Sequence, residues 1–515
     1  MTKKLDGLSP GKALELIGLI IDSGGDIKSQ PALDHASALL DQFQLGEVLD
    51  QYASQAHYFR ANLWNARRRM SVNWQTWLWK SDTIDGEIFE LRRAIRHPGF
   101  IELNVIVQAQ IYTNLGNILN HIGRFVEAIE YWDRALVVVP GFAMASGNLG
   151  IGLAYYASAL HDSGHQDVLM IFAARSLSMA LDKEAIYDSP DSLVAIEHFS
   201  NRLAAICNYY NIPQMTVDFD LENHPMGRGK KEREYRRWCL NQRLFINPLN
   251  DVGSNPIAAH DVMTLPSITV GIDDGPGPPY VIHHFNIIKQ EFCAARFALY
   301  EGMNSEGVHF SDRGVLLFNT LDYPAFGYGV ERIKMAFRGA YAVFDKIAFL
   351  LNAYFALGHS EKTVNFRKVW LDKGKGKTLH PSLDGMANWP LRGLFWLSKD
   401  IFEDNFKELT EPDAQLLSEL RNHMEHKFVS VHDNFLRTMS PFMSETPKVG
   451  VFDISVDDLI SKTLRQLKLA RAAIIYLSLA VYAEEKRRKL EKGENKFTVP
   501  MILDIWEDDW KRRNL

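Results

Sequence analysis

The side chains of this sequence best suited to acid–base chemistry lie in the segment Arg421–His426, which reads RNHMEH. Asn422 and His426 are four residues apart, so on a helix they lie on one face. Histidine titrates near neutral pH and can act there as a general acid or base. Two interpretations follow. The face lines a second interface or a cleft where His426 does chemistry, or it carries ordinary polar surface residues.

A helix must position these side chains, and the apolar pattern predicts one from Asp413 to Leu436. Its predicted core stripe consists of Leu417, Leu420, Met424, Phe428 and Val431, which cluster on the helical wheel. Asn422 and His426 lie nearly opposite that stripe, and Arg421 lies between the two faces.

Helical periodicity also predicts the elements around this helix. The expected helices are His284–Glu301, Gly329–Leu357, Leu394–Asn405 and Val456–Leu490. Long helices with few strands between them indicate a helical bundle over residues 281–515.

Residues 1–210 are expected to form a separate helical region. Asn114-Leu115-Gly116 recurs as Asn148-Leu149-Gly150, 34 residues later, which is the tetratricopeptide period. The window Ala109–Pro140 resembles one full repeat, with large and small residues at the expected offsets, a turn at Gly123 and a terminating proline. A TPR-like helical solenoid is therefore expected, serving either to bind a partner or ligand or only as a scaffold.

A proline- and glycine-rich basic connector is expected at residues 211–280, and Gly271–Pro279 is expected to lack regular structure. Its segment Arg228–Arg243 is basic, and a second basic stretch is Lys362–Lys377. The residues proposed to contact RNA are Arg228, Lys230, Lys231, Arg236, Arg237, Lys373, Lys375 and Lys377. Solvated surface charge is the alternative for both segments.

The motif Arg421-Asn422-x-x-x-His426, within an all-helical C-terminal region, resembles the R-N-x-x-x-H motif of the HEPN superfamily. The resemblance covers roughly residues 285–515. It implies an all-α bundle and a metal-independent endoribonuclease that needs no cofactor and forms a homodimer or higher homo-oligomer. It also implies that Arg421, Asn422 and His426 are catalytic, with His426 as acid or base, Arg421 stabilising phosphoryl charge and Asn422 orienting His426 or the phosphate.

Three further residues are auxiliary candidates. His423 and Glu425 occupy variable positions inside the motif, where a solvated role is the alternative. Asp345 is a charge within a predicted apolar helix, and a salt bridge with a neighbouring Lys or Arg is its alternative role. No metal is expected, because His423, His426 and His432 do not share one helical face and no H-E-x-x-H motif is present.

The composition sets limits on the function. The chain has 515 residues, 46% hydrophobic and 23% charged, with a net charge of −6, so nonspecific attraction of nucleic acid by the whole surface is not expected. Three cysteines without a C-x-x-C pair favour a reducing, cytoplasmic location. The N-terminus reads as an amphipathic helix, and the longest apolar run, Ala472–Ala483, is too short to span a membrane.

The resemblance to the HEPN superfamily further implies an RNA-cleaving toxin or antiviral-defence effector that cuts cellular RNA such as tRNA. The TPR-like region would sense a protein or ligand trigger or mediate oligomerisation. The alternative is a non-catalytic TPR/HEPN adaptor that binds nucleotide or a protein partner.

Overall fold

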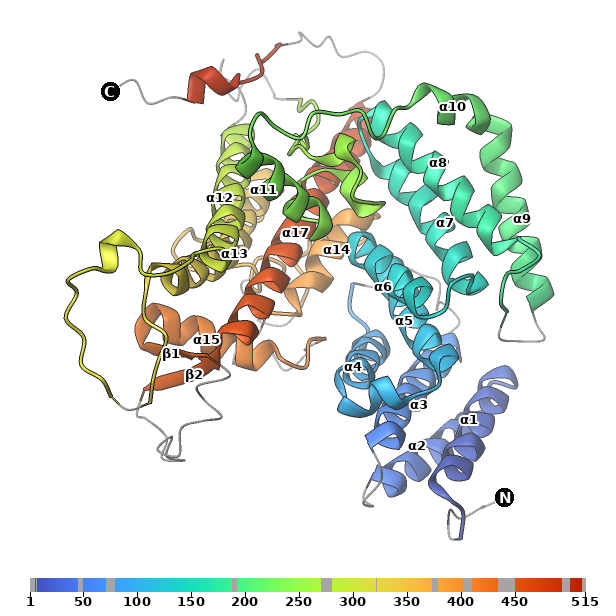
Figure 1. The fold of residues 1–515 in the computed structure, drawn as a ribbon. Coiled ribbons are helices and arrows are strands. Elements are labelled where there is room, and N and C mark those ends of the chain that lie inside the picture. Colours follow the sequence, from blue (N-terminus) through green and yellow to red (C-terminus); the bar gives the residue numbers. More distant parts are fainter. Residues whose placement is uncertain are drawn as a thin grey trace.

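The computed structural model describes residues 5, 7–44, 50–70, 79–187, 192–269, 280–320, 322–372, 378–401, 410–433, 450–492 and 501–511. The fold is all-α, and within these ranges the strands form one two-stranded parallel sheet. The N-terminal helices form a curved array along one side, and a helical bundle occupies the other (Figure 1).

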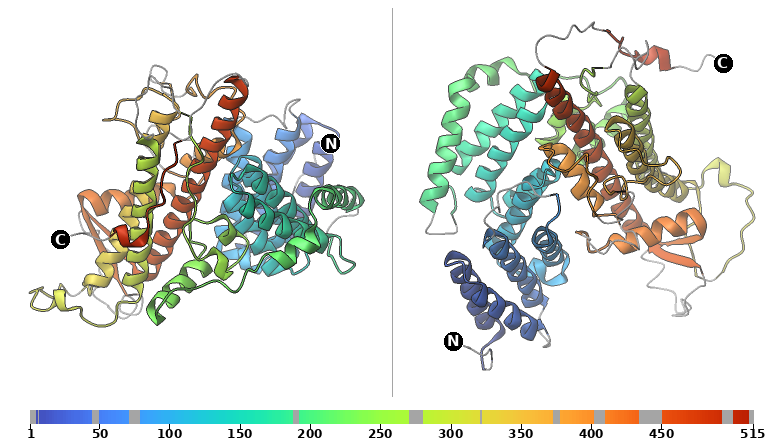
Figure 2. Two further views of the ribbon diagram at one scale, coloured as in Figure 1. Left: turned by 90° about the horizontal axis from the view of Figure 1, so that it is seen from above. Right: turned by 180° about the vertical axis from the view of Figure 1, so that it is seen from behind.

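The array contains the first nine helices, packed mostly against their neighbours in sequence (Figure 2). They are α1 (Pro10–Asp26), α2 (Gln30–Gln44), α3 (Asp50–Met70), α4 (Asp82–Arg96), α5 (Val105–His121), α6 (Phe125–Val138), α7 (Ala143–Ala159), α8 (Ser163–Ala180) and α9 (Ser192–Tyr209).

The α5–α6 hairpin is the predicted repeat Ala109–Pro140, and its packing agrees with the pattern of large and small residues. A Cβ on Gly116 would lie 2.6 Å from the indole nitrogen of Trp132, so only glycine permits this helix approach. The turn at Gly123 has φ +92°, and a Cβ there would meet the backbone of Trp389 at 2.2 Å. The array therefore contacts the C-terminal half directly at this turn.

The predicted connector, residues 211–280, contains helices and a buried stretch that packs against the rest of the protein. It contains α10 (Ile212–Asp218) and α11 (Lys230–Asn241), and residues 244–251 are buried. Arg471 donates to Asp251 at 2.5 Å and to the Asn247 carbonyl at 2.8 Å, with every partner buried. This segment thus joins the two halves within one core. Gly271–Pro279 lies outside the described residues.

The bundle is formed by α12 (Tyr280–Met303), α13 (Tyr328–Tyr354), α14 (Trp389–Ser398) and α17 (Val456–Lys492). Helix α17 runs diagonally between the array and the α12–α13 pair (Figure 1). It is long and apolar enough to cross a membrane, but 83% of its most apolar window is buried in the protein, as expected of a core helix. The predicted helices over these residues are present, although α14 starts and ends earlier than expected, and residues 402–409 lie outside the described part.

The predicted helix Asp413–Leu436 is wrong in its second half. Helix α15 spans Ala414–His426, and strand β1 (Phe428–His432) follows and pairs in parallel with β2 (Val451–Ser455). Phe428 is consequently exposed rather than in the core. Apolar and polar residues alternate from Val429 to His432, and the segment FVSVH contains two valines, a strand pattern that also fits one stripe of a helical wheel.

Candidate active site

Helix α15 presents the three motif residues at its C-terminal end. Leu417 and Leu420 are buried and fasten the helix to the bundle, whereas Asn422 and His426 are exposed. The predicted separation of an apolar face from an Asn–His face is therefore confirmed. In the single chain that second face is open to solvent.

Arg421 is half-buried and lies against α13. Its Nη2 is 3.2 Å from Oδ2 of Asp345, and its guanidinium lies 5.4 Å from the ring centroid of Tyr341. Burial raises the pKa of Tyr341 to about 12, so this neighbour stays a neutral phenol at physiological pH. The Asp345 carboxylate and the Tyr341 ring thus both contact the Arg421 guanidinium and orient it.

Asp345 has a second contact that fixes its carboxylate. Its Oδ1 accepts a hydrogen bond from the backbone N–H of Phe366 at 3.4 Å. The structure therefore brings together Arg421 and Asp345, which are 76 residues apart in the chain. The contact is the salt bridge that was considered for Asp345. Because its partner is a motif residue, the contact also fits a role of Asp345 in the site.

The other two auxiliary candidates differ in their surroundings. The Nδ1–H of His423 donates to the Glu419 carbonyl at 2.8 Å, and the His423 ring lies 5.7 Å from that of Phe452 on β2. His423 therefore helps to dock α15 on the two-stranded sheet. Glu425 is exposed.

Another histidine follows the motif on β1. His432 is buried, and its Nε2 lies 3.0 Å from Oδ1 of Asp453 and 2.9 Å from Oγ of Ser430. A histidine in a nucleophilic triad contacts the nucleophile through one ring nitrogen and the carboxylate through the other. Ser430 and Asp453 both contact Nε2 of His432, so these three residues do not form such a triad. Within the described ranges, no group of three or more His, Cys, Asp or Glu side chains is placed to hold a metal ion.

The basic residues of α11 lie away from α15, beside α12 and higher in the bundle (Figure 1). Arg236 is committed to the fold, since it donates to the Ala259 carbonyl at 2.6 Å and pairs with Glu232 at 2.9 Å. Arg228, Lys230, Lys231 and Arg237 are exposed. The structure does not bring this helix next to the motif, and Lys373, Lys375 and Lys377 lie outside the described residues.

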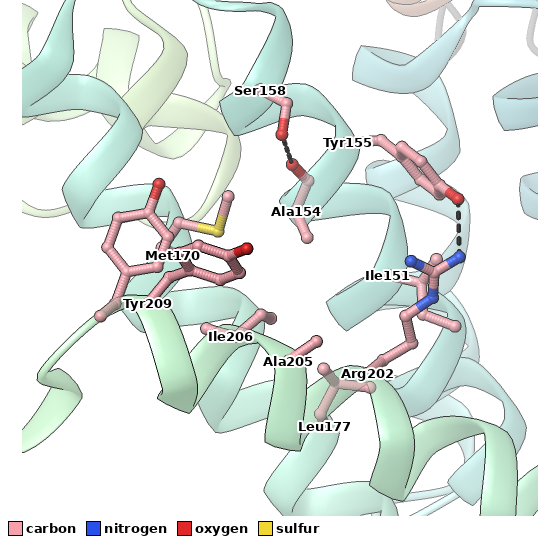
Figure 3. Close-up of a pocket in the computed structure, with 11 residues that line it drawn as sticks. Ile151, Ala154, Tyr155, Ser158, Met170, Leu177, Arg202, Ala205, Ile206 and Tyr209 are labelled. Carbon is pink, nitrogen blue, oxygen red and sulfur yellow. Dashed lines mark hydrogen bonds between the residues drawn. The ribbon is translucent and has the colours of Figure 1, made fainter.

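The array contains a cavity of about 550 Å³ between α7, α8 and α9 (Figure 3). Its wall is mainly apolar and aromatic, and Arg202 donates to the hydroxyl of Tyr155 at 2.9 Å at one edge. Tyr209 lies at the opposite end (Figure 3). Helices α7, α8 and α9 lie on the opposite side of the molecule from α15 (Figure 1), so a ligand bound in this cavity would not touch His426.

Charged residues that sequence reasoning missed surround the start of α15. Glu411 and Asp413 precede the helix and pair with Arg96 of α4, and Asp400 pairs with Arg92 at 2.7 Å. These partners are about 300 residues apart in the chain, and no local pattern marks them.

Comparison with known proteins supports the assignment of the bundle. No curated protein and no solved structure matches the chain. Residues 272–484 match the family model described as LA2681-like HEPN, which spans α12 to most of α17 and includes the motif. Residues 272–484 are therefore similar to a HEPN domain.

Proposed function

We propose that this protein is a metal-independent endoribonuclease that cuts cellular RNA such as tRNA. The observation that carries the proposal is the position of Arg421, Asn422 and His426 within the matched HEPN domain, on a helix whose motif face is exposed. The family match by itself supports only a nuclease or nucleotide-related role.

The chemistry uses the nucleophile that RNA already carries. The 2′-hydroxyl attacks the adjacent phosphorus, its proton passes to a base, and the 5′-oxygen leaves as a hydroxyl after protonation by an acid. The products are a 2′,3′-cyclic phosphate and a 5′-hydroxyl, so neither water nor a metal is required in this step.

Each motif residue has a role in that scheme. His426 moves a proton at the 2′- or 5′-oxygen, and Arg421 neutralises the charge on the phosphoryl oxygens through its planar guanidinium. Asn422, one turn before His426, donates from its amide to orient the phosphate or the imidazole. Asp345 holds Arg421 in a fixed direction, at 3.2 Å.

A single chain supplies one acid–base histidine on this face, although the reaction uses both an acid and a base. Among the residues that the structure describes, His426 makes no hydrogen bond or ion pair. We therefore place a second copy of the chain over α15, so that two motif helices face each other and two copies of His426 serve as acid and base.

In the cell, this activity suits a toxin or antiviral-defence effector. The N-terminal array would then receive the trigger, and the cavity between α7, α8 and α9 offers a place for a small ligand or a peptide side chain. The array would alternatively set the oligomeric state.

The test uses purified protein and total RNA in EDTA, with products resolved on a denaturing gel. Cleavage by the wild type, its loss in His426→Ala and its retention in Gln415→Ala would support the proposal. Gln415 is a matched control because it is exposed on the same helix and its side-chain amide donates to the neighbouring Glu419 at 3.1 Å.

One observation favours the alternative function, a non-catalytic adaptor. The His426 side chain is exposed, and no described residue orients its ring in the single chain. If neither the monomer nor any oligomer cuts RNA, in the absence or presence of a trigger, the adaptor is the better account. In that case the motif face would bind a nucleotide or a protein.

A further inference from the structure

Helix α4 of the N-terminal array makes ionic contacts with the chain that leads into the motif helix. Arg92 donates to Asp400 at 2.7 Å and to the Thr410 carbonyl at 3.0 Å. Arg96 pairs with Asp413 at 2.8 Å and also with Glu411. We name these side chains the α4–α15 clamp: Arg92, Arg96, Asp400, Thr410, Glu411 and Asp413.

Two acidic groups of the clamp are deeply buried, whereas the side chain of Asp413 is 43% exposed. Asp400 and Glu411 are almost fully inaccessible, and Thr410 donates to Asp400 at 2.5 Å. Burial alone would raise the pKa of Asp400, but the charges of Arg124 and Arg92 hold it well below its usual range. Buried charges of this kind are tolerated only while paired, so the clamp resists separation of its two sides.

The clamp ends at the first turn of α15. The Glu411 carbonyl accepts from the Ala414 N–H at 3.1 Å, and a Glu411 side-chain oxygen accepts from the Asp413 N–H at 3.1 Å. Asp413 is the N-cap residue, yet its side chain makes no capping hydrogen bond and reaches Arg96 instead. The charge on Arg96 therefore acts on the residue at which the motif helix begins.

Glu411 is also held from the opposite side. Arg465 of α17 pairs with the same carboxylate that Arg96 contacts from α4. Burial, together with the charges of Arg96 and Arg92, lowers the pKa of Arg465 to about 10, so these three cations repel one another around Glu411. One carboxylate thus joins the array, the core helix and the start of α15.

We infer that α4 positions the motif helix through Arg96 and Asp413, so that a displacement of α4 in the array changes the placement of Arg421, Asn422 and His426. An effect of this coupling on RNA cleavage rests on the proposed ribonuclease function. The effect of α4 on the position of α15 does not depend on that function. Arg421 lies eight residues beyond Asp413, about 12 Å along a helix, a distance over which an α-helix moves as a rigid unit. Arg96 and Asp413 are positioning residues in this account, and neither touches RNA.

The test compares Arg96→Gln and Asp413→Asn with the matched control Arg93→Gln. Arg93 is exposed on the same helix, outside the clamp, so its substitution removes one charge from α4 and leaves the clamp intact. Arg96→Gln leaves Arg92 and Arg465 beside Glu411, so the full-length protein is expected to fold. Asp413→Asn keeps a good N-cap residue and removes only the charge.

Amide hydrogen exchange of the full-length protein measures the coupling without using activity. In both clamp variants, exchange in residues 414–426 is expected to rise about tenfold, with α12 and α13 unchanged. Single-turnover cleavage is expected to slow about tenfold with KM unchanged. Arg93→Gln should match the wild type in both assays.

Three results would overturn the inference: exchange in α15 that stays at the level of Arg93→Gln, exchange that rises equally throughout the chain, or faster exchange in α15 with undiminished cleavage. If the wild type cuts no RNA, the kinetic arm counts against the proposed function. The exchange arm still decides whether α4 holds α15.

Discussion

Nη2 of Arg421 lies 3.2 Å from Oδ2 of Asp345, a contact that joins the motif helix α15 to the long bundle helix α13. The two side chains are 40% and 36% exposed, so the pair is accessible to a substrate phosphate. An exposed ion pair of this kind contributes little to stability, below about 1 kcal/mol. Its value therefore lies in directing the guanidinium.

Asp345→Asn should accordingly slow RNA cleavage while leaving the fold intact. We expect kcat to fall about tenfold because Arg421 loses its fixed direction, and the free energy of unfolding to change by less than about 1 kcal/mol. Single-turnover kinetics and urea denaturation measure the two quantities. A variant as active as the wild type would remove Asp345 from the site.

The buried pair of Asp251 and Arg471 should behave in the opposite way. Each side chain is 2% exposed, and the Tyr156 hydroxyl also donates to Asp251 at 3.1 Å. Asp251→Ala leaves a buried guanidinium without its carboxylate, so a loss of about 3–5 kcal/mol in unfolding free energy is expected. Urea denaturation tests this, and a loss below about 1 kcal/mol would show that the segment is a loose linker after all.

His121 should make the protein less stable in mild acid. Burial, aided by the charges of Arg392 and Arg68, lowers the pKa of His121 to about 4. In the unfolded chain, the histidine has a pKa near 6.5 and binds a proton at a higher pH than it does in the folded protein. The stability that the protein has while His121 is neutral is therefore lost as the pH falls from about 6.5 to about 4.

The variant His121→Leu isolates that contribution. Wild-type unfolding free energy should fall by on the order of 2 kcal/mol more than that of His121→Leu over this pH range. Denaturation curves at pH 7, 6, 5 and 4 give the comparison. Parallel pH profiles for the two proteins would mean that His121 titrates normally in the folded chain.

The exposed cations of α11 should contribute to RNA affinity. The double variant Lys231→Ala/Arg237→Ala is expected to weaken binding and to reduce the slope of log affinity against log salt concentration by about one to two. Titration of the His426→Ala background with RNA at several salt concentrations measures this. Lys12→Ala/Lys183→Ala, with two exposed lysines of the array, is the control, and equal losses in both would leave α11 without a special role.

Local periodicity was sufficient to predict much of this molecule. The 3.6-residue repeat of apolar residues identified α12, α13 and α17 and placed Asn422 and His426 on a common exposed face. The same criterion failed over residues 428–431, where a strand pattern coincided with a helical stripe: Phe428 is exposed, whereas Val431 is buried as predicted but lies on a strand. Parallel pairing with residues 451–455 decided between the two, and pairing between distant segments leaves no local signal.

Contacts across long chain separations explain the other differences. Asp345 attracted notice as a charge within an apolar helix, but its partner, 76 residues away, followed only from the fold. The clamp residues Arg92 and Asp400 are 308 residues apart, and each alone reads as an ordinary surface charge. The buried segment at residues 244–251 was predicted to be part of a connector because Pro248 and the prolines on either side of it, Pro225 and Pro256, end regular structure without indicating burial.

The most direct test of the central claim is the chemistry of the RNA ends. Total RNA is incubated with wild type, His426→Ala or Gln415→Ala in EDTA, and new ends are sequenced with and without removal of cyclic phosphates. We predict discrete 2′,3′-cyclic phosphate and 5′-hydroxyl ends with the wild type and Gln415→Ala. With His426→Ala, these ends should be reduced at least a hundredfold while the protein stays folded. The same ends at undiminished yield from His426→Ala, or cleavage that EDTA abolishes, would contradict the account.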